Sequence, residues 1–191
     1  MSYIFFTSDT HFGHKNIIEY SGRPYSDIKE HDESLIQNWN NTVRRGDLVY
    51  HLGDFALTKS DYAKNVLRRL NGHIHFIYGN HDMKSLCKDK EFLNMFGWHG
   101  HYKEVSVQVD NEKKKIVLFH FPIESWNKRH YKSWHLHGHC HGSLPSDNHQ
   151  CRVDVGVDVW DYTPVSLDVI KNHMKKKVFK PIDHHGRGHK R

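Results

Sequence analysis

The chain of 191 residues has little cysteine and no long apolar run. Its three cysteines, Cys87, Cys140 and Cys151, are an odd and sparse set, which is poorly suited to a disulfide framework and typical of a reducing compartment. No apolar stretch approaches the roughly eighteen residues that cross a bilayer, and the first residues, MSYIFFTSDTHFGH, lack the layout of a signal peptide. We therefore expect a soluble cytoplasmic protein with no membrane partner.

Charge is unevenly distributed along the chain. The formal net charge is +6, and much of the excess lies in the final segment, KNHMKKKVFKPIDHHGRGHKR. We expect residues 1–180 to form a single domain and residues 181–191 to form a flexible, basic, histidine-rich tail, although length alone also permits two very small domains. Such a tail could attract nucleic acid or another polyanion, but a solvated terminus is the more common role.

The first eighty residues alternate between strand and helix patterns. Residues 3–8, 48–54 and 73–79 have the composition of buried strands. Apolar residues at helical spacing predict a helix over residues 27–43. A second helix is predicted over residues 58–72, with Thr58 and Asp61 in the register of a capping box. The order β-α-β-α-β predicts a parallel sheet with helices packed against it, and therefore an α/β fold.

The second half of the chain has a different pattern. Val105, Val107 and Val109 alternate with polar residues, and KKIVLFH follows a turn-like DNEK, which predicts an antiparallel hairpin. Residues 133–139 and 152–160 are predicted as two more strands, and residues 166–176 as a closing helix.

Polar residues follow the strands at the points where the strands end. Ligands in open α/β sheets collect beyond the carboxyl ends of the strands, where the loops converge, so these residues are expected to form one site. The sets are DTH at 9–11, GD at 53–54, GNHD at 79–82, the single His120, and GHCHG at 138–142.

Seven of these residues have the donor atoms of metal ligands: two carboxylates, one amide and four imidazoles. Seven groups are too many for one tetrahedral ion, but they suit two ions about 3.5–4 Å apart if one carboxylate bridges them. The mixed nitrogen and oxygen set favours manganese, iron or zinc, and the positive charge that remains favours a phosphate-like substrate. Alone, Asp9 could be a helix N-cap and Asn80 a turn residue. The seven residues are Asp9, His11, Asp54, Asn80, His120, His139 and His141.

Taken together and in this order, the five motifs resemble those of the calcineurin-like metallophosphoesterase family. They span Asp9 to Gly142. The intervening SGRPYSDI and WNNTVRRGDLVYHLGDF also resemble compact bacterial and bacteriophage members of that family. The resemblance implies a four-layer α/β/β/α sandwich of two mixed sheets flanked by helices.

The resemblance also implies a role for each site residue. Asp9, His11 and His141 would hold one metal ion; Asn80, His120 and His139 would hold the other; Asp54 would bridge both. His81 would contact the scissile phosphate and protonate the leaving group, with Asp82 orienting its ring or capping the helix that follows. A hydroxide held between two transition-metal ions, with manganese foremost and iron or zinc as alternatives, would attack phosphorus in line.

Several neighbouring residues have less specific interpretations. Arg23 and Arg129 could bind a substrate phosphate or could be ordinary surface residues. His135 and His137 could support a ligand histidine, and Cys140 is expected to face away as a small buried packing residue.

The sequence favours hydrolysis of a phosphomonoester or phosphodiester, and a nucleotide or nucleic-acid end is one candidate. It leaves the oligomeric state open. The alternatives are a catalytically idle scaffold with this fold and a polyanion-binding protein that acts through the basic tail.

Overall fold

The computed structural model describes residues 2–145 and 151–180. Its first sheet has five strands in the order β4-β3-β2-β1-β9. Strands β1 to β4 pair with one another in parallel, which confirms the predicted parallel sheet, and β9 is added at the edge antiparallel to β1. The strands are β1 Ile4–Thr7, β2 Leu48–His51, β3 His73–Ile77, β4 Trp98–Gly100 and β9 Val165–Ser166.

The second sheet has four strands in the order β5-β6-β7-β8. Strands β5 and β6 form the predicted antiparallel hairpin, and β7 and β8 continue the sheet in parallel. Both sheets are therefore mixed. The strands are β5 Tyr102–Val109, β6 Glu112–Phe119, β7 Trp134–His137 and β8 Arg152–Asp154.

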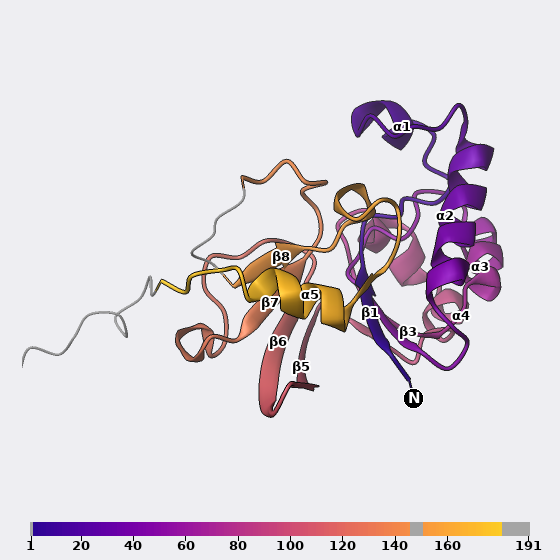
Figure 1. Cartoon of the computed structure of the whole chain (residues 1–191). Helices are drawn as coiled ribbons and strands as arrows, with labels where there is room; N and C mark the ends of the chain where they lie inside the picture. Colours follow the sequence, from indigo (N-terminus) through magenta and orange to yellow (C-terminus); the bar gives the residue numbers. More distant parts are fainter. Residues whose placement is uncertain (1, 146–150, 181–191) are drawn as a thin grey trace, which may run out of the picture.

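Two hydrophobic cores flank the first sheet because successive strand residues face opposite sides. Phe5 packs toward the helices, whereas Phe6 packs into the core between the two sheets. Figure 1 shows α2, α3 and α4 on the outer side of β1 and β3, and β5 to β8 on the other side. The two mixed sheets flanked by helices confirm the predicted α/β fold. The helices are α1 Ile17–Tyr20, α2 Ile28–Thr42, α3 Ser60–Arg69, α4 Lys90–Leu93 and α5 Leu167–Met174.

Two local predictions were wrong. The N-cap of α3 is Lys59, with no side-chain hydrogen bond, so Thr58 and Asp61 form no capping box. The strand predicted over residues 152–160 ends at Asp154, whose carboxylate accepts the backbone N–H of Gly156 at 2.8 Å. The chain then crosses to the first sheet, where the N–H of Val157 donates to the carbonyl of Ser8 at 3.0 Å. This crossing brings the short 3-10 helix Val157–Val159 beside the end of β1.

Residues 181–191, where the basic tail is predicted, lie outside the described residues. Among the residues that are described, no helix is both long and apolar enough to cross a lipid bilayer.

Candidate metal centre

Five of the seven predicted ligands have a left-handed backbone conformation, which residues other than glycine rarely adopt. All five lie in loops just beyond the strands, where the chain turns sharply. Asp9, His11 and Asp54 are buried, His141 is partly buried, and His139 is exposed. Strained backbone of this kind clusters at functional sites because only the surrounding structure can maintain it. The five are Asp9 (φ 57°), His11 (51°), Asp54 (55°), His139 (72°) and His141 (48°).

The ligand atoms of the predicted residues converge on two neighbouring positions. Those of Asp9, His11 and His141 lie within 4.8 Å of one another, and so do those of Asp9, Asp54 and His120. Asn80 adds its amide oxygen to the second group, 3.1 Å from His120 Nε2 and 3.0 Å from His139 Nδ1. All seven residues are therefore brought together at one edge of the two sheets.

Asp54 lies between the two imidazole sets. Its Oδ2 is 3.8 Å from His11 Nε2 and 3.5 Å from His120 Nε2. Asp9 also belongs to both groups, but its two carboxylate oxygens already accept the backbone N–H of His139 at 3.1 and 3.0 Å. Asp54 is thus the carboxylate whose Oδ2 faces imidazoles of both sets.

His11 is the least satisfied polar side chain of the cluster. The ring is buried, and within the described part of the chain neither of its nitrogens has a hydrogen-bond partner. Buried polar atoms are nearly always paired, and a metal ion would supply the partner for a nitrogen lone pair. The donor chemistry and this unpartnered nitrogen fit a transition-metal site.

Two glycines permit the close approach of the ligand loops. A Cβ at Gly79 would lie 2.1 Å from Asp54 Oδ1, and a Cβ at Gly138 would lie 2.4 Å from Asp9 Oδ2. Any other residue at either position would displace a carboxylate, so Gly79 and Gly138 are required by packing.

The electrostatics of the cluster reflect its burial. Burial raises the pKa of Asp9 to about 6 and lowers the pKa of His11. Burial also opposes the charged forms of Asp54 and His120, but their mutual attraction outweighs it: the pKa of Asp54 falls, and the pKa of His120 rises to about 9. Positive charge near the two buried carboxylates, Asp9 and Asp54, therefore stabilises their ionised forms.

His81 lies at the rim of the cluster. Its side chain is 34% exposed, its Nε2 is 4.0 Å from Asp54 Oδ2, and its ring centroid is 5.4 Å from that of His11. Its backbone N–H donates to Asp54 Oδ1 at 2.9 Å. The ring therefore combines access to solvent with proximity to the ligands.

Asp82 does not orient the His81 ring, and that prediction was wrong. The Asp82 carboxylate is fully buried and accepts three backbone N–H groups, from Asp54 (2.6 Å), Gly79 (2.9 Å) and Phe55 (2.9 Å). It is not a helix cap either, because the N-cap of the following 3-10 helix is His81. The sequence indicated that the Asp82 carboxylate belongs to the site, but its hydrogen-bond partners are backbone N–H groups of the loops after β2 and β3.

Neither predicted phosphate-binding arginine is available to a substrate. The buried Arg23 guanidinium donates to both Asp158 oxygens and to the backbone carbonyls of Asp9 and Thr10. The Arg129 side chain is 1% exposed and lies near the Trp126 and Phe179 rings, 5.3 and 5.4 Å from their centroids. Both arginine side chains therefore form part of the protein interior.

The segment WHLHGHCHG, with its four regularly spaced histidines, does not form one extended strand. Strand β7 ends at His137, and left-handed residues follow at 139 and 141. His135 contacts the backbone carbonyls of Val117 and Phe121, and His137 contacts that of Gly138. Among the described residues, neither ring forms a hydrogen bond with a predicted ligand. Cys140 is partly exposed, so it is not the buried packing residue that was expected.

Two neighbours of the site were missed. Asp158 Oδ2 lies 2.7 Å from His141 Nδ1. The His14 ring lies with its centroid 5.4 Å from that of His11 and 6.2 Å from that of His81. The second acidic residue of the VDVGVD segment was the available signal for Asp158, but its partner depends on the chain crossing between the sheets.

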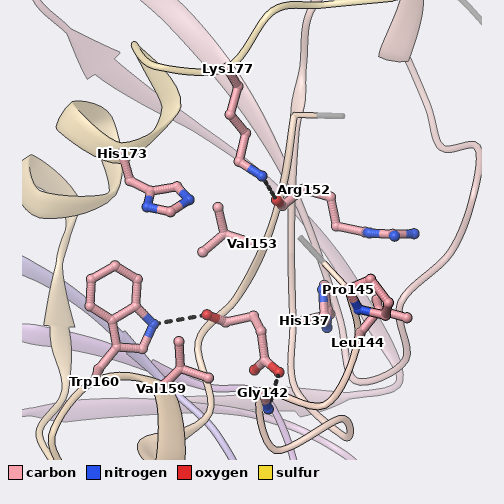
Figure 2. Close-up of a pocket in the computed structure, with 11 residues that line it drawn as sticks. His137, Gly142, Leu144, Pro145, Arg152, Val153, Val159, Trp160, His173 and Lys177 are labelled. Atoms are coloured by element: carbon pink, nitrogen blue, oxygen red, sulfur yellow. Dashed lines mark hydrogen bonds between the residues drawn. The ribbon is translucent and has the colours of Figure 1, made fainter. Parts of the chain in front are cut away.

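The loop that carries His139 and His141 also borders a cavity of about 190 Å³. Figure 2 shows Trp160, Val153 and His173 on one side of it and His137, Leu144 and Pro145 on the other. Asp154 lies on its wall and accepts the backbone N–H of Gly142 at 3.1 Å, which anchors the loop next to His141.

Residues 3–156 match the profile of the calcineurin-like phosphoesterase superfamily domain. The chain belongs to this family. Membership indicates metal-dependent hydrolysis of phosphoesters, and the metal-ligand groups described above are consistent with it.

Relatives of this calcineurin-like phosphoesterase occur in archaea, bacteriophages and bacteria. An uncharacterised protein of Methanocaldococcus jannaschii is 38% identical over 96% of this chain and 98% of its own. The gene 66 protein of Mycobacterium phage L5 is 29% identical over 84% and 88%. A crystal structure of an Aquifex aeolicus protein of unknown function has the same fold, with a TM-score of 0.68, 24% identity, and coverage of 91% of this chain and 100% of its own.

Proposed function

We propose that this protein is a binuclear metal-dependent phosphoesterase. Asp9, His11 and His141 would hold one ion; Asn80, His120 and His139 would hold the other; Asp54 would bridge the two. The single observation that carries this proposal is the position of Asp54 Oδ2, which lies within 3.8 Å of one imidazole nitrogen from each set.

The charge of the proposed site would favour an anionic ester. Two bound transition-metal ions, with manganese foremost and iron or zinc as alternatives, would supply an activated water and neutralise charge on the phosphoryl oxygens. The chain contributes two carboxylates and four imidazoles as ligands, so the loaded site keeps a net positive charge. That charge favours phosphate esters over neutral substrates.

His81 would act on the leaving group. The partly exposed ring can reach a substrate at the rim, and an imidazole N–H is a suitable proton donor to a leaving oxygen. Asp82 would have a structural role: it would hold the loops of Asp54 and Gly79 in place by accepting their backbone N–H groups.

The substrate would be a phosphodiester or phosphomonoester, with a nucleotide or nucleic-acid end as one candidate. The net charge of +6 supports a polyanionic partner. A catalytically idle scaffold is less well supported, because the seven ligand residues and His81 are all in place around one site.

The test is a hydrolysis panel in manganese-supplemented buffer. It compares a nitrophenyl phosphate monoester, a bis-nitrophenyl diester, and 2′,3′- and 3′,5′-cyclic nucleotides. We expect hydrolysis of at least one substrate class, and a loss of at least about 100-fold with Asp54→Asn together with loss of bound metal. Asp47→Asn is the matched control, because Asp47 is also buried and accepts backbone N–H groups, from Tyr3 and Arg44, both at 2.8 Å. Full activity of Asp54→Asn would refute the proposal.

A further inference from the structure

Asp158 contacts a predicted metal ligand through a short hydrogen bond. It lies in the 3-10 helix Val157–Val159, and its side chain is 7% exposed. Its Oδ2 is 2.7 Å from Nδ1 of His141, whereas Nε2 of the same ring faces Asp9 Oδ1 at 3.9 Å. Ser21 Oγ is a second, longer neighbour of Nδ1, at 3.2 Å. The two nitrogens of His141 thus point in opposite directions, one to Asp158 and one to the ligand cluster.

This contact fixes which nitrogen of His141 carries the proton. An ionised carboxylate can only accept a hydrogen bond, so Nδ1 must be the donor. In a neutral imidazole the lone pair then lies on Nε2, the nitrogen that faces Asp9. A metal-binding histidine needs its lone pair on the side of the ion, and its other N–H commonly donates to a carboxylate.

Arg23 holds Asp158 in a defined place. Its Nε and Nη2 donate to Oδ1 and Oδ2 of Asp158, both at 2.8 Å, which is the paired geometry that guanidinium and carboxylate favour. The same Nη2 donates to the backbone carbonyl of Asp9 at 2.7 Å. One buried guanidinium therefore connects the carboxylate that contacts His141 to the backbone of Asp9.

We propose that Asp158 is a positioning residue that orients His141 for metal binding, and that Arg23 fixes Asp158 relative to Asp9. Two ligands from distant parts of the sequence would then be set in place before an ion arrives. This inference rests on the proposed function, in which Asp9 and His141 are ligands of the same ion.

A purely structural role for Asp158 makes a different prediction. If Asp158 served only to neutralise the buried Arg23, its loss would lower the stability of the fold and leave the ligand set unchanged. If it orients His141, its loss must also weaken the metal position that contains His141, and must do so more than the position that contains Asn80, His120 and His139.

The test compares Asp158→Asn with the wild-type protein and with Asp47→Asn. An asparagine amide can donate as well as accept, so it no longer fixes the proton of His141. We expect manganese affinity to fall roughly 10- to 100-fold at one position, as is usual when the outer partner of a ligand histidine is removed. Bound metal after gel filtration, measured by elemental analysis, should therefore fall from two ions per chain toward one. Asp47→Asn should retain two, since its carboxylate contacts no ligand.

A second readout needs neither metal nor activity. The ¹⁵N chemical shifts of His141 in the metal-free protein, recorded at a pH high enough to keep the ring neutral, report which ring nitrogen is protonated. We expect the Nδ1–H form in the wild type and a mixture of both forms in Asp158→Asn. If that variant does not fold, Arg23→Lys is the substitute: it keeps the charge but loses the forked pair, and it should weaken the same metal position to a smaller degree.

The outcomes separate the two proposals. Two ions bound with unchanged affinity in a folded Asp158→Asn, or in Arg23→Lys where that substitute is needed, would overturn the positioning role and leave the proposed function intact. A wild-type protein that binds no transition metal would overturn the proposed function and the positioning role with it.

Discussion

The carboxylate of Asp82 accepts the backbone N–H of Asp54 at 2.6 Å, and thereby ties the loop after β3 to the loop after β2. The same carboxylate accepts two further backbone N–H groups, and it is fully buried. Asp82 therefore supports the site by holding the backbone of a ligand.

Removing this carboxylate should weaken both the fold and the metal site. Asp82→Ala leaves three buried N–H groups without an acceptor, for which we expect a loss of about 3 kcal/mol or more in the free energy of unfolding. Asp82→Asn keeps one acceptor oxygen and should lose less. Urea unfolding followed by tryptophan fluorescence measures the first effect, and metal content measures the second. Native stability and metal content, combined with a defect that depends on the leaving group, would restore the role of orienting His81.

Substitution of His81 should separate chemistry from metal binding. His81→Ala removes a proton donor at the rim and no proposed ligand, so the protein should keep its two ions. The rate should fall about 100-fold or more for an alkyl or nucleoside leaving group, which needs a proton. It should fall much less for nitrophenolate, which leaves without one. Steady-state rates on a matched pair of esters test this, with the exposed His101→Ala as the control. An equal loss on both esters would contradict the proton-donor role.

Manganese should stabilise the folded protein. A ligand that binds only the native state at about 100 times its dissociation constant adds about 2.7 kcal/mol, which for a chain of this size raises the melting temperature by roughly 5–10 °C. Differential scanning fluorimetry with and without manganese measures the shift, and a chelator should reverse it. Asp54→Asn should show a much smaller shift. An equal shift in that variant would place the stabilising ions elsewhere.

Glu104, which is not a residue of the metal centre, should make the free energy of unfolding depend on pH. Hydrogen bonds from Lys115, Tyr102 and Asn127 lower the pKa of Glu104 from 4.5 to about 2. Because this carboxyl is more acidic in the folded state, its contribution is complete above pH 4.5 and is lost as the pH falls toward 2. The side chain is partly exposed, so we expect about 1 kcal/mol.

The measurement for Glu104 is the free energy of unfolding of wild type and Glu104→Gln at pH 7, 4.5 and 3, with metal removed by chelator. The difference between the two proteins should shrink as the pH falls. A difference that stays constant over this range would show that the carboxylate charge is not responsible.

Much of the fold was predictable because its information is local. Apolar residues at helical spacing in α2 and the buried runs of β1, β2 and β3 identify their own elements, and alternation of strand and helix leads to a parallel sheet. Parallel strands end at one edge, so Asp9, Asp54 and Asn80 had to approach one another. The capping box before α3 failed because a short motif is easily matched by chance: the helix begins at Ser60, so its N-cap is Lys59 and not Thr58.

The sequence by itself determined the family, the parallel sheet and the seven residues at the strand ends, since each follows from motif order or from periodicity along the chain. Only the tertiary structure decided which partners the buried charges have. Asp82 serves the backbone of Asp54, Arg23 pairs with a carboxylate 135 positions away, and Asp158 reaches His141 because the chain crosses from one sheet to the other. A hydrogen bond between distant residues depends on how the two sheets pack, and no local pattern in the sequence records that.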